Sequence, residues 1–351
     1  MVVIAELEQT LNDERIGAEK MDEHVKKILI EKIESLGLRS YGFMKVKRLT
    51  SSEEYFRKRI ELGYQTTFEE NDIPRKIDLS TEMPEGKTIV SIAFPYHFNA
   101  EISKEGYFSM YTLGKDYHLV LKDYLEEIAD VLRNHGYEAK CFADNNALPE
   151  RYIAYVSGVG EIGRNHMLIT KDYGSKVFLG EIITDFEMET QEKDFREIEK
   201  YDICGTCRNC LKACPTQIIG NIFYDTHRCM SYITQNKEVS DEDLKLFKGR
   251  LFGCDTCQLV CPWNKDIEIS PLMDFKPRDY MKHPNLLNLV KLSNEEFKKY
   301  KETSAGWRGK KLLQRNAMIE LMRKGRTIDE SSLGTAYLKS YYHRLKDVFK
   351  L

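Results

Sequence analysis

The sequence predicts an α/β (α+β) domain, followed by a cysteine-rich module and a short α-helical C-terminal region. Apolar segments that alternate between strand and helix periodicity fill the chain up to about residue 187. Eight of the nine cysteines then lie between Cys204 and Cys261, and the segment 301–351 carries 12 basic residues against 5 acidic ones. The predicted domains are 1–190, 191–270 and 271–351.

The first domain is predicted to build a layered sheet from alternating helices and strands. A helix is expected over 1–38, where apolar residues recur at helical spacing and Gly37 suits the C-cap position. Further helices are expected at 118–135 and 149–156, with a polar helix-and-loop region at 52–86. Buried strands are expected at 42–46, 88–93, 138–142, 166–170 and 177–184.

Composition excludes several classes of protein. With 42% hydrophobic residues, 9 prolines and 21 glycines, the chain is neither disordered nor fibrous. A formal net charge of −3 excludes a uniformly basic nucleic-acid-binding surface. The charge is uneven, because 301–351 has an excess of seven positive charges and residues 1–300 carry −10. This asymmetry hints at a polyanionic partner, and a solvated helical surface is the alternative.

The chain shows no export signal and no membrane segment. Glu6 and Glu8 follow closely on the first residues, so there is neither a basic n-region nor a long apolar h-region. The longest apolar stretches, 88–96 and 177–184, are far shorter than the ~20 residues of a membrane helix. We therefore expect a reduced, soluble, cytoplasmic protein, in which crowded cysteines bind metal rather than form disulfides.

The cysteine block has the spacing of bacterial ferredoxins, in which three thiolates bind one cubane and the fourth reaches a second. It reads Cys204-x2-Cys207-x2-Cys210-x3-Cys214-Pro215, then a lone Cys229, then Cys254-x2-Cys257-x3-Cys261-Pro262. Eight thiolates suffice for two 4Fe–4S clusters, because iron in such clusters prefers soft sulfur ligands. The crossover assigns one cluster to Cys204, Cys207, Cys210 and Cys261, and the other to Cys214, Cys229, Cys254 and Cys257.

Two alternatives accompany this assignment. Zinc prefers paired CxxC motifs, so one cluster together with zinc is the alternative for the block. Cys141 lies outside it, in an apolar run, and is expected to be a buried structural thiol.

Together with a second set of motifs, the cysteine block resembles the epoxyqueuosine reductase family. The matching stretches are 114–118 (Gly-Lys-Asp-Tyr-His), 144–181, 228–235, 253–264 and 307–317 (beginning Trp-Arg-Gly-Lys-Lys). The resemblance covers about residues 25–325. It implies a cobalamin-binding α/β domain followed by a ferredoxin-like module, a design similar to that of reductive dehalogenases. The implied activity is that of an oxidoreductase that reduces epoxyqueuosine to queuosine in the tRNA anticodon loop.

The resemblance also implies a route for electrons and protons. Electrons would pass from a low-potential donor through the two clusters to cobalamin, whose cobalt would act on the epoxide carbon. Asp144 would be the proton donor, with its pKa raised by burial near the corrin. A turn or N-cap role before the 149–156 helix is the alternative for Asp144. The sequence departs from the family's usual pattern at Asn145-Asn146-Ala147 and at Glu161.

Cobalamin contacts are implied at six positions, since the chain has no Asp-x-His-x-x-Gly string to supply an axial histidine. These positions are Arg75, Ser109, Asp144, Leu168, Leu179 and Ser231. Without the resemblance, the leucines read as strand core, Ser109 as a loop hydroxyl and Arg75 as a surface cation. His118 is a further possible ligand, and a capping or packing role at a helix start is its alternative.

The basic C-terminal region is expected to bind the tRNA anticodon loop, with cations on phosphates and an aromatic side chain stacking on an extruded base. The predicted contacts are Gln235, Arg250, Trp307, Arg308, Lys310, Lys311 and Arg315. A solvent-facing helix with a buried tryptophan is the alternative. The family's helical repeats would be represented by about one helix pair after Asn316, and we expect a monomer.

Two other functions are compatible with the same motifs. One is a corrinoid iron–sulfur reductase that acts on a small molecule, and the other is a corrin-free iron–sulfur electron-transfer protein. The basic C-terminal region weighs against the first, and the long domain before the cysteines weighs against the second.

Overall fold

The computed structural model describes residues 21–351, and a four-stranded antiparallel sheet forms the core of its first part. The strand order is β1 (Tyr41–Lys45), β2 (Thr88–Pro95), β7 (Val177–Thr184) and β4 (Ala139–Phe142). These strands confirm the predictions at 42–46, 88–93, 177–184 and 138–142. The strand predicted at 166–170 is only two residues long, β6 (Leu168–Ile169), and it pairs with β5 (Glu161–Ile162) in a separate ribbon.

Helices cover both faces of the sheet. One face packs against α2 (Thr50–Glu61), α3 (Ile73–Ile77) and α5 (Glu150–Val156), and the other against the helix at 21–35 and α4 (Tyr117–Arg133). The side chains of β2 alternate between these cores, because successive residues of a strand point to opposite faces. All strand pairs in this sheet are antiparallel, so the domain is of the α+β type.

Local signals explain where the two helices on this second face begin and end. The Asp116 carboxylate caps α4 by accepting a hydrogen bond from the backbone N–H of His118 at 3.0 Å. The helix at 21–35 ends before Gly37, whose φ of +78° is the left-handed conformation expected of a C-cap glycine. The part of the predicted helix over 1–20 lies outside the described residues.

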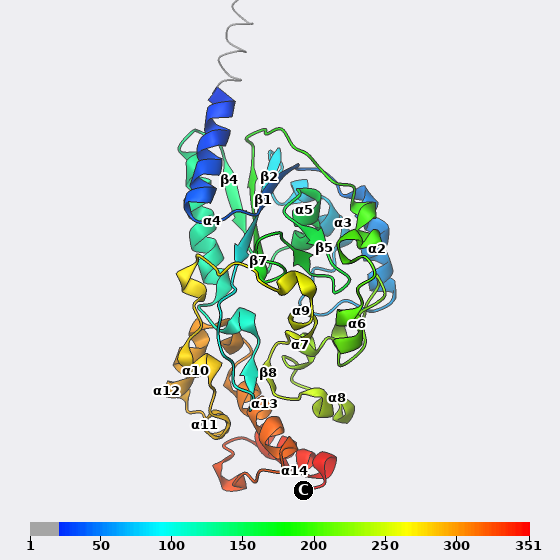
Figure 1. Ribbon diagram of the computed structural model, residues 1–351, viewed down its shortest axis with the longest axis vertical. Helices are drawn as coiled ribbons and strands as arrows, with labels where there is room; N and C mark the ends of the chain where they lie inside the picture. The colour runs from blue at the N-terminus through cyan, green and yellow to red at the C-terminus, as the bar shows by residue number, and fades with distance from the viewer. Residues whose placement is uncertain (1–20) are drawn as a thin grey trace, which may run out of the picture.

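The cysteine region is built from short elements and leans against the first domain (Figure 1). Its strand β8 (Arg250–Phe252) pairs in parallel with β3 (Tyr107–Phe108), which belongs to the first half of the chain. Gly253 follows with a φ of +75°, and a Cβ at this position would lie 2.5 Å from Cβ of Ser109. The other elements are η3 (Phe195–Lys200), η4 (Asp202–Cys204), α6 (Asn209–Ala213), η5 (Thr226–Arg228), α7 (Met230–Ile233), α8 (Asp241–Leu246), α9 (Thr256–Leu259) and η6 (Pro262–Asn264).

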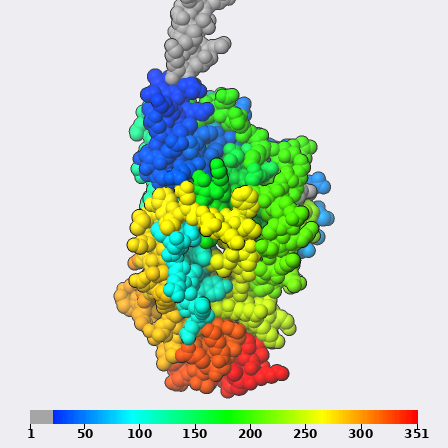
Figure 2. All heavy atoms as spheres, in the orientation of Figure 1, coloured from blue at the N-terminus to red at the C-terminus, as the bar shows by residue number. Residues whose placement is uncertain are grey.

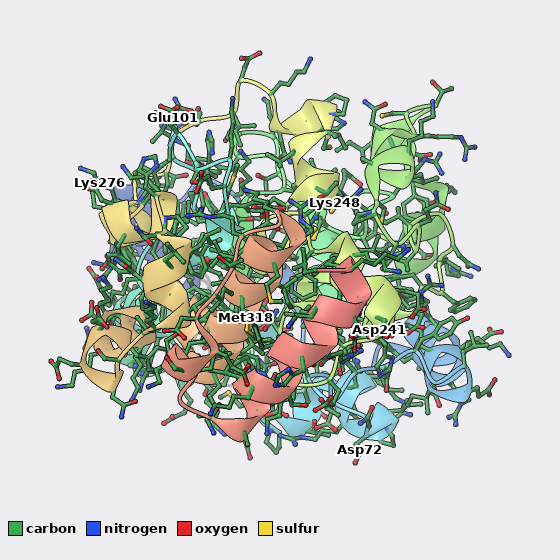
Figure 3. The ribbon with its side chains drawn as sticks, turned by 90° about the horizontal axis from the view of Figure 1, so that it is seen from below. Asp72, Glu101, Asp241, Lys248, Lys276 and Met318 are labelled. Atoms are coloured by element: carbon green, nitrogen blue, oxygen red, sulfur yellow. The ribbon has the colours of Figure 1, made fainter. Side chains whose placement is uncertain are left out.

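The C-terminal region packs around α13 (Lys310–Arg323), which is buried along most of its length. Figure 3 shows Met318 of this helix near the centre of the end view, next to α14 (Ala336–Phe349). The same core contains Phe247 and Leu251, so it draws residues from both sides of position 270. The predicted boundaries at 190 and 270 stay predictions. The remaining elements are η7 (Met273–Phe275), α10 (Asp279–Lys282), α11 (Leu286–Val290), α12 (Asn294–Phe297), η8 (Lys298–Glu302), η9 (Ser304–Gly306) and η10 (Glu330–Ser332).

The segment around β3 contacts both the cysteine region and the C-terminal region. In Figure 2 it is the cyan strip that crosses the face between the yellow and the orange parts of the chain. Its backbone bonds to both sides, from Ser103 to the carbonyl of Lys282 and from Tyr107 to the carbonyl of Gly249. It continues into η2 (Met110–Thr112). Over residues 21–351, the structure contains no helix that is both long and apolar enough to span a membrane.

Candidate active site and cluster sites

A large cavity lies where β7, the start of α4 and the C-terminal region meet. Together with its open mouth it encloses about 2030 Å³. Apolar and aromatic side chains form one wall, namely Tyr111, Met167, Leu168, Val177, Phe178 and Leu179. Polar groups from α4 and the loop after β4 form another, namely Asp116, Tyr117, His118, Asp144, Asn145 and Glu150. Such a cavity can hold a large, flat, mostly apolar group against a small set of polar ones.

Asp144 is the centre of a hydrogen-bonded group in this cavity. The hydroxyl of Tyr117 donates to its Oδ2, and Nε2 of His118 lies 3.2 Å from the same oxygen. The other ring nitrogen of His118, Nδ1, lies 2.8 Å from Oδ1 of Asp116. The ring of Tyr117 stacks on Phe178, with 4.4 Å between ring centroids. These contacts fix the direction in which the Asp144 carboxylate faces the cavity.

The charges of this group correct the expectation that burial raises the pKa of Asp144. Burial does act to raise it, but the hydrogen bonds from His118 and Tyr117 outweigh this effect and lower the pKa. For His118, burial acts to lower the pKa, and the hydrogen bonds to Asp116 and Asp144 raise it to about 9. At neutral pH the proton shared by the pair therefore resides on His118, while Asp144 is ionised.

Glu150, in the first turn of α5, accepts hydrogen bonds from the loop that carries Asp144. Asp144 and Asn145 both have a φ of +48°, and Oε1 of Glu150 accepts from the backbone N–H of Asp144 at 2.6 Å. Asn146 donates to the same oxygen at 3.1 Å, so the departure from the family pattern supplies loop contacts. Burial and the nearby Asp144 charge raise the pKa of Glu150 to about 7. The residue at the N-cap of α5 is Pro149, so the alternative N-cap role for Asp144 is not what the structure displays.

The eight clustered cysteines line two further cavities, four around each. A cavity of about 370 Å³ has Cys204, Cys207, Cys210 and Cys261 in its wall. A cavity of about 990 Å³ has Cys214, Cys229, Cys254 and Cys257 in its wall. These are the same two sets that the ferredoxin crossover predicts. Within 21–351, no three His, Cys, Asp or Glu side chains are arranged to hold a single metal ion.

The two cysteine cavities differ in their relation to the large cavity. The one around Cys254 shares five lining residues with it, namely Tyr111, Arg151, Met167, Val177 and Phe178, and we call it the inner cluster site. The one around Cys204 shares no lining residue with the large cavity and includes the exposed Trp263, and we call it the outer cluster site. Asn165 lines both cluster sites, so the inner site lies between the outer site and the large cavity.

The six residues predicted to contact cobalamin are divided between different places. Asp144, Leu168 and Leu179 line the large cavity, and Ser231 lines the inner cluster site. Arg75 instead pairs with Glu70 and Glu82 and is not in the lining of the large cavity.

Ser109 is fully buried, with its hydroxyl 2.5 Å from Oδ1 of Asp255. Asp255 also accepts from the backbone N–H of Met110 at 2.9 Å. Ser109 therefore anchors the loop that carries Cys254 to the segment before Tyr111. Ser109 is not among the side chains that line the large cavity, and its contact with cobalamin stays a prediction.

Two of the predicted tRNA contacts are buried. Arg315 is 0% exposed and donates to the carbonyls of Thr234, Asn236 and Lys237. Arg250 is 7% exposed and donates to the sulfur of Cys254. Neither guanidinium lies on an open surface, and the expectation that they bind phosphates stays a prediction. The positive charge of these two residues could be read from the sequence, but their burial could not.

Phe68 and Trp307 line the large cavity, and Tyr232 packs against Phe68; we call these three residues the aromatic rim. Trp307 is 53% exposed and Phe68 45% exposed, with ring centroids 5.2 Å apart. The guanidinium of Arg308 lies over both rings. Nε1 of Trp307 donates to the side chain of Gln235, and Arg308 donates to its backbone carbonyl.

The predicted residues Gln235, Trp307 and Arg308 therefore meet at one place. The exposed Trp307 contradicts the alternative of a buried tryptophan. Sequence reasoning missed Phe68, whose only signal was an isolated aromatic residue in the polar region 52–86. Lys311 is exposed, and Lys310 is half-buried, with its ammonium 2.7 Å from Oδ1 of Asn294.

Comparisons with known proteins agree on one family. Residues 203–264 match the family described as "4Fe-4S double cluster binding domain", and residues 76–145 match "Epoxyqueuosine reductase QueG, DUF1730". The epoxyqueuosine reductase of Bacillus subtilis (strain 168) is 35% identical over 311 residues, 85% of this chain and 78% of the relative. That of Staphylococcus aureus (strain NCTC 8325 / PS 47) is 29% identical over 348 residues, 92% of this chain and 90% of the relative.

Solved structures give the same result. A crystal structure of selenomethionine-labelled epoxyqueuosine reductase superposes with a TM-score of 0.84 at 31% identity, covering 93% of this chain and 91% of the other. Epoxyqueuosine reductase crystallised with an epoxyqueuosine-modified tRNA stem loop gives 0.82 at 30% identity, covering 94% of this chain and all of the other. The likeness therefore extends over the sheet, the cysteine region and the C-terminal helices.

Proposed function

Because the chain belongs to the epoxyqueuosine reductase family, we propose that its large cavity is the place where it reduces epoxyqueuosine to queuosine in tRNA. The observation that best supports this proposal is that three sites adjoin one another. The outer cluster site, the inner cluster site and the large cavity adjoin in this order, and Asp144 with its partners faces the last of them. A cytoplasmic location is part of the same proposal, because the proposed substrate is a tRNA.

The residues present fit the cofactors that the family implies. Each cluster site has four thiolates, the donor type that iron–sulfur clusters require. The large cavity offers a broad apolar wall for a corrin ring, in which Leu168, Leu179 and Phe178 take part. When bound, the clusters supply one-electron transfer and cobalamin supplies the reducing centre for the epoxide.

The protein's own part in the reaction is the supply of protons. Conversion of an epoxide to an alkene breaks two C–O bonds, consumes two electrons and two protons, and releases water. Oxygen that gains negative charge needs a proton donor nearby, and such a donor contributes about 10²–10⁴-fold to a rate. We assign this task to Asp144, which passes on the proton that His118 holds at neutral pH. Tyr117 keeps the carboxylate directed at the cavity.

The aromatic rim is the proposed entry for the modified nucleoside. Phe68 and Trp307 offer exposed rings at the mouth of the cavity, and an extruded base can stack on such rings. The half-buried Arg308 and the exposed Lys311 lie where they can meet neighbouring phosphates. A low-potential electron donor and a monomeric state remain proposals that accompany this function.

The direct test is to mix the purified protein, reconstituted with iron, sulfide and cobalamin, with epoxyqueuosine-containing tRNA and a reductant. Nucleoside analysis should then show queuosine. Retention of cobalamin without any queuosine would contradict the proposed substrate and would favour a small-molecule reductase. Failure to retain cobalamin would contradict the proposed role of the cavity.

Asp144→Asn is the matched variant for the proton-donor role. We expect turnover to fall by about 10²–10⁴-fold, because the amide cannot pass on a proton. Cluster content and cobalamin absorbance should stay at the level of the parent protein. Unchanged turnover would remove Asp144 from the mechanism.

A further inference from the structure

Arg250 makes an unusual set of contacts for a basic residue next to a cysteine site. Its Nε lies 3.2 Å from Sγ of Cys254, and its terminal nitrogens donate to the carbonyls of Leu246 and Phe247 and to the hydroxyl of Thr256. The residue is 7% exposed, and it forms no salt bridge with a carboxylate of the described residues, although the charge of Asp255 also acts on it. The guanidinium is therefore a buried positive charge held against one cluster ligand.

The outer cluster site has a different donor. There a neutral group, the backbone N–H of Arg164, donates to Sγ of Cys204 at 3.3 Å. The guanidinium of Arg164 reaches the carbonyl of Gly205 instead. The two sites thus differ in the charge of the group that donates to the sulfur.

We infer that Arg250 raises the reduction potential of the inner cluster and thereby directs electrons from the outer site to the inner one. Reduction adds one negative charge to a cluster, and a buried cation that donates to a ligand sulfur stabilises the reduced form more than the oxidised one. Second-sphere hydrogen bonds of this kind tune a metal centre without binding the metal. Arg250 is therefore a positioning and tuning residue, and its role rests on the proposed assignment of the eight cysteines to two clusters.

The position of Arg250 in the fold explains how the contact is maintained. It is the first residue of β8, whose pairing with β3 brings the Cys254 loop beside Tyr111 and the large cavity. The two carbonyls that accept from it come from the end of α8, so the guanidinium also closes that helix. The same segment thus places the inner cluster next to the cavity and sets the charge around it.

The test is a redox titration followed by electron paramagnetic resonance, on the protein with both clusters reconstituted. Arg250→Gln should shift the midpoint potential of one cluster to more negative values and leave the other unchanged. Cys254→Ser, which alters a ligand of the inner cluster, identifies which transition belongs to it. Arg164→Gln is the matched control, since it removes an arginine beside the outer site and keeps the backbone N–H; it should not move the inner midpoint.

Arg250→Lys covers the case in which Arg250→Gln does not assemble. Its ammonium can still meet the carbonyls of Leu246 and Phe247, while the bond from Nε to the sulfur is lost, so a smaller shift in the same direction is expected. Unchanged midpoints with full iron content in either variant would overturn the inference. A shift in the midpoint potential of the outer cluster, and not of the inner one, would overturn the inference as well.

The outcomes also separate this inference from the proposed function. A parent protein without two reducible clusters would contradict the cysteine assignment itself. If the parent protein holds two reducible clusters and the Arg250 variants shift both midpoint potentials equally, only the role of Arg250 is contradicted.

Discussion

At the scale of single residues, the site is defined by how neighbours share one proton. Asp144 and His118 lie 3.2 Å apart, and Asp116 holds the other ring nitrogen of the histidine. The consequence is an ionised carboxylate beside a charged imidazole, rather than a carboxylic acid kept neutral by burial. The proton needed at the epoxide oxygen is therefore held on His118, and not on Asp144 as the sequence led us to expect.

This arrangement predicts a loss of activity at high pH. The pKa of His118 in the folded protein is raised to about 9, so the histidine is charged below that pH and loses its proton as pH rises through it. We expect turnover to fall above pH about 9, and His118→Asn to lower turnover at neutral pH and to remove this fall. Single-turnover rates measured from pH 6.5 to 10 on the reconstituted protein check this, with Lys115→Ala, which alters a neighbour of the group, as the control. A parent profile that stays flat through pH 9 would contradict the role of His118.

The same shift has a consequence for stability with a definite sign. A histidine whose pKa is higher in the folded than in the unfolded state binds its proton more tightly when folded. Its contribution to the free energy of unfolding is complete below pH about 6.5 and is lost as pH rises through about 9.

At the scale of elements, the central strands carry a buried carboxyl. Glu181 of β7 lies opposite Ser91 of β2 in the register, and its Oε1 accepts from the Ser91 hydroxyl at 3.2 Å. Both residues are fully buried, and Oε2 of Glu181 has no hydrogen-bond partner in the described structure. Burial, followed by the charge of Glu150, raises the pKa of Glu181 well above its ordinary value.

Replacing this carboxyl is expected to change the pH dependence of stability. Because the pKa is raised in the folded state, the folded protein binds the proton more tightly, and stability falls as pH rises above the ordinary pKa of a glutamate. Glu181→Gln should leave the free energy of unfolding nearly unchanged at pH 5 and raise it at pH 8 by on the order of 1–3 kcal/mol. Urea unfolding at the two pH values measures this, with Ser91→Ala as the matched variant. If the free energy of unfolding of Glu181→Gln depends on pH as strongly as that of the parent protein, the expected protonation of Glu181 is contradicted.

At the scale of the whole molecule, the substrate site is assembled from segments far apart in the chain. Phe68 comes from the loop between α2 and α3, Tyr232 from α7, and Trp307 from just before α13, yet their rings touch. The rim therefore forms only when the first domain, the cysteine region and the C-terminal helices are together. Binding of tRNA is expected to depend on this assembly.

Two substitutions separate stacking from charge in tRNA binding. Trp307→Ala should weaken the affinity by about 1–3 kcal/mol without changing its salt dependence, because it removes a stacking surface. Lys311→Ala should weaken binding and lower the slope of log affinity against log salt by about one, because it removes a phosphate contact. Equilibrium binding of an anticodon stem loop at several salt concentrations checks both. Lys339→Ala, on α14, is the control for an exposed lysine of the same basic region.

Much of the fold and the division of the cysteines could be predicted from the sequence. The strands at 88–93 and 177–184 carry apolar β-branched runs, which indicate strands because both faces of the sheet are covered. The strands at 42–46 and 138–142 were predicted from shorter apolar stretches. The order of the strands was not predictable, since it depends on pairings between residues up to about ninety positions apart, such as Ser91 with Glu181. The family resemblance and the crossover of the cysteines rest on local spacing, which tertiary structure does not alter.

What only the tertiary structure decided is the environment of each charged side chain. Arg250, Arg308, Lys311 and Arg315 are alike in the sequence, as cations near the quoted motifs. In the structure, Arg250 faces a cysteine sulfur, Arg308 lies over the aromatic rim, Lys311 is exposed and Arg315 is wholly buried. Likewise Asp144 was recognisable as a candidate acid, while its protonation was set by Tyr117 and His118. The physical reason is that ligand spacing and strand periodicity are local properties of the chain. Burial, charge pairing and hydrogen-bond partners arise only where distant segments meet.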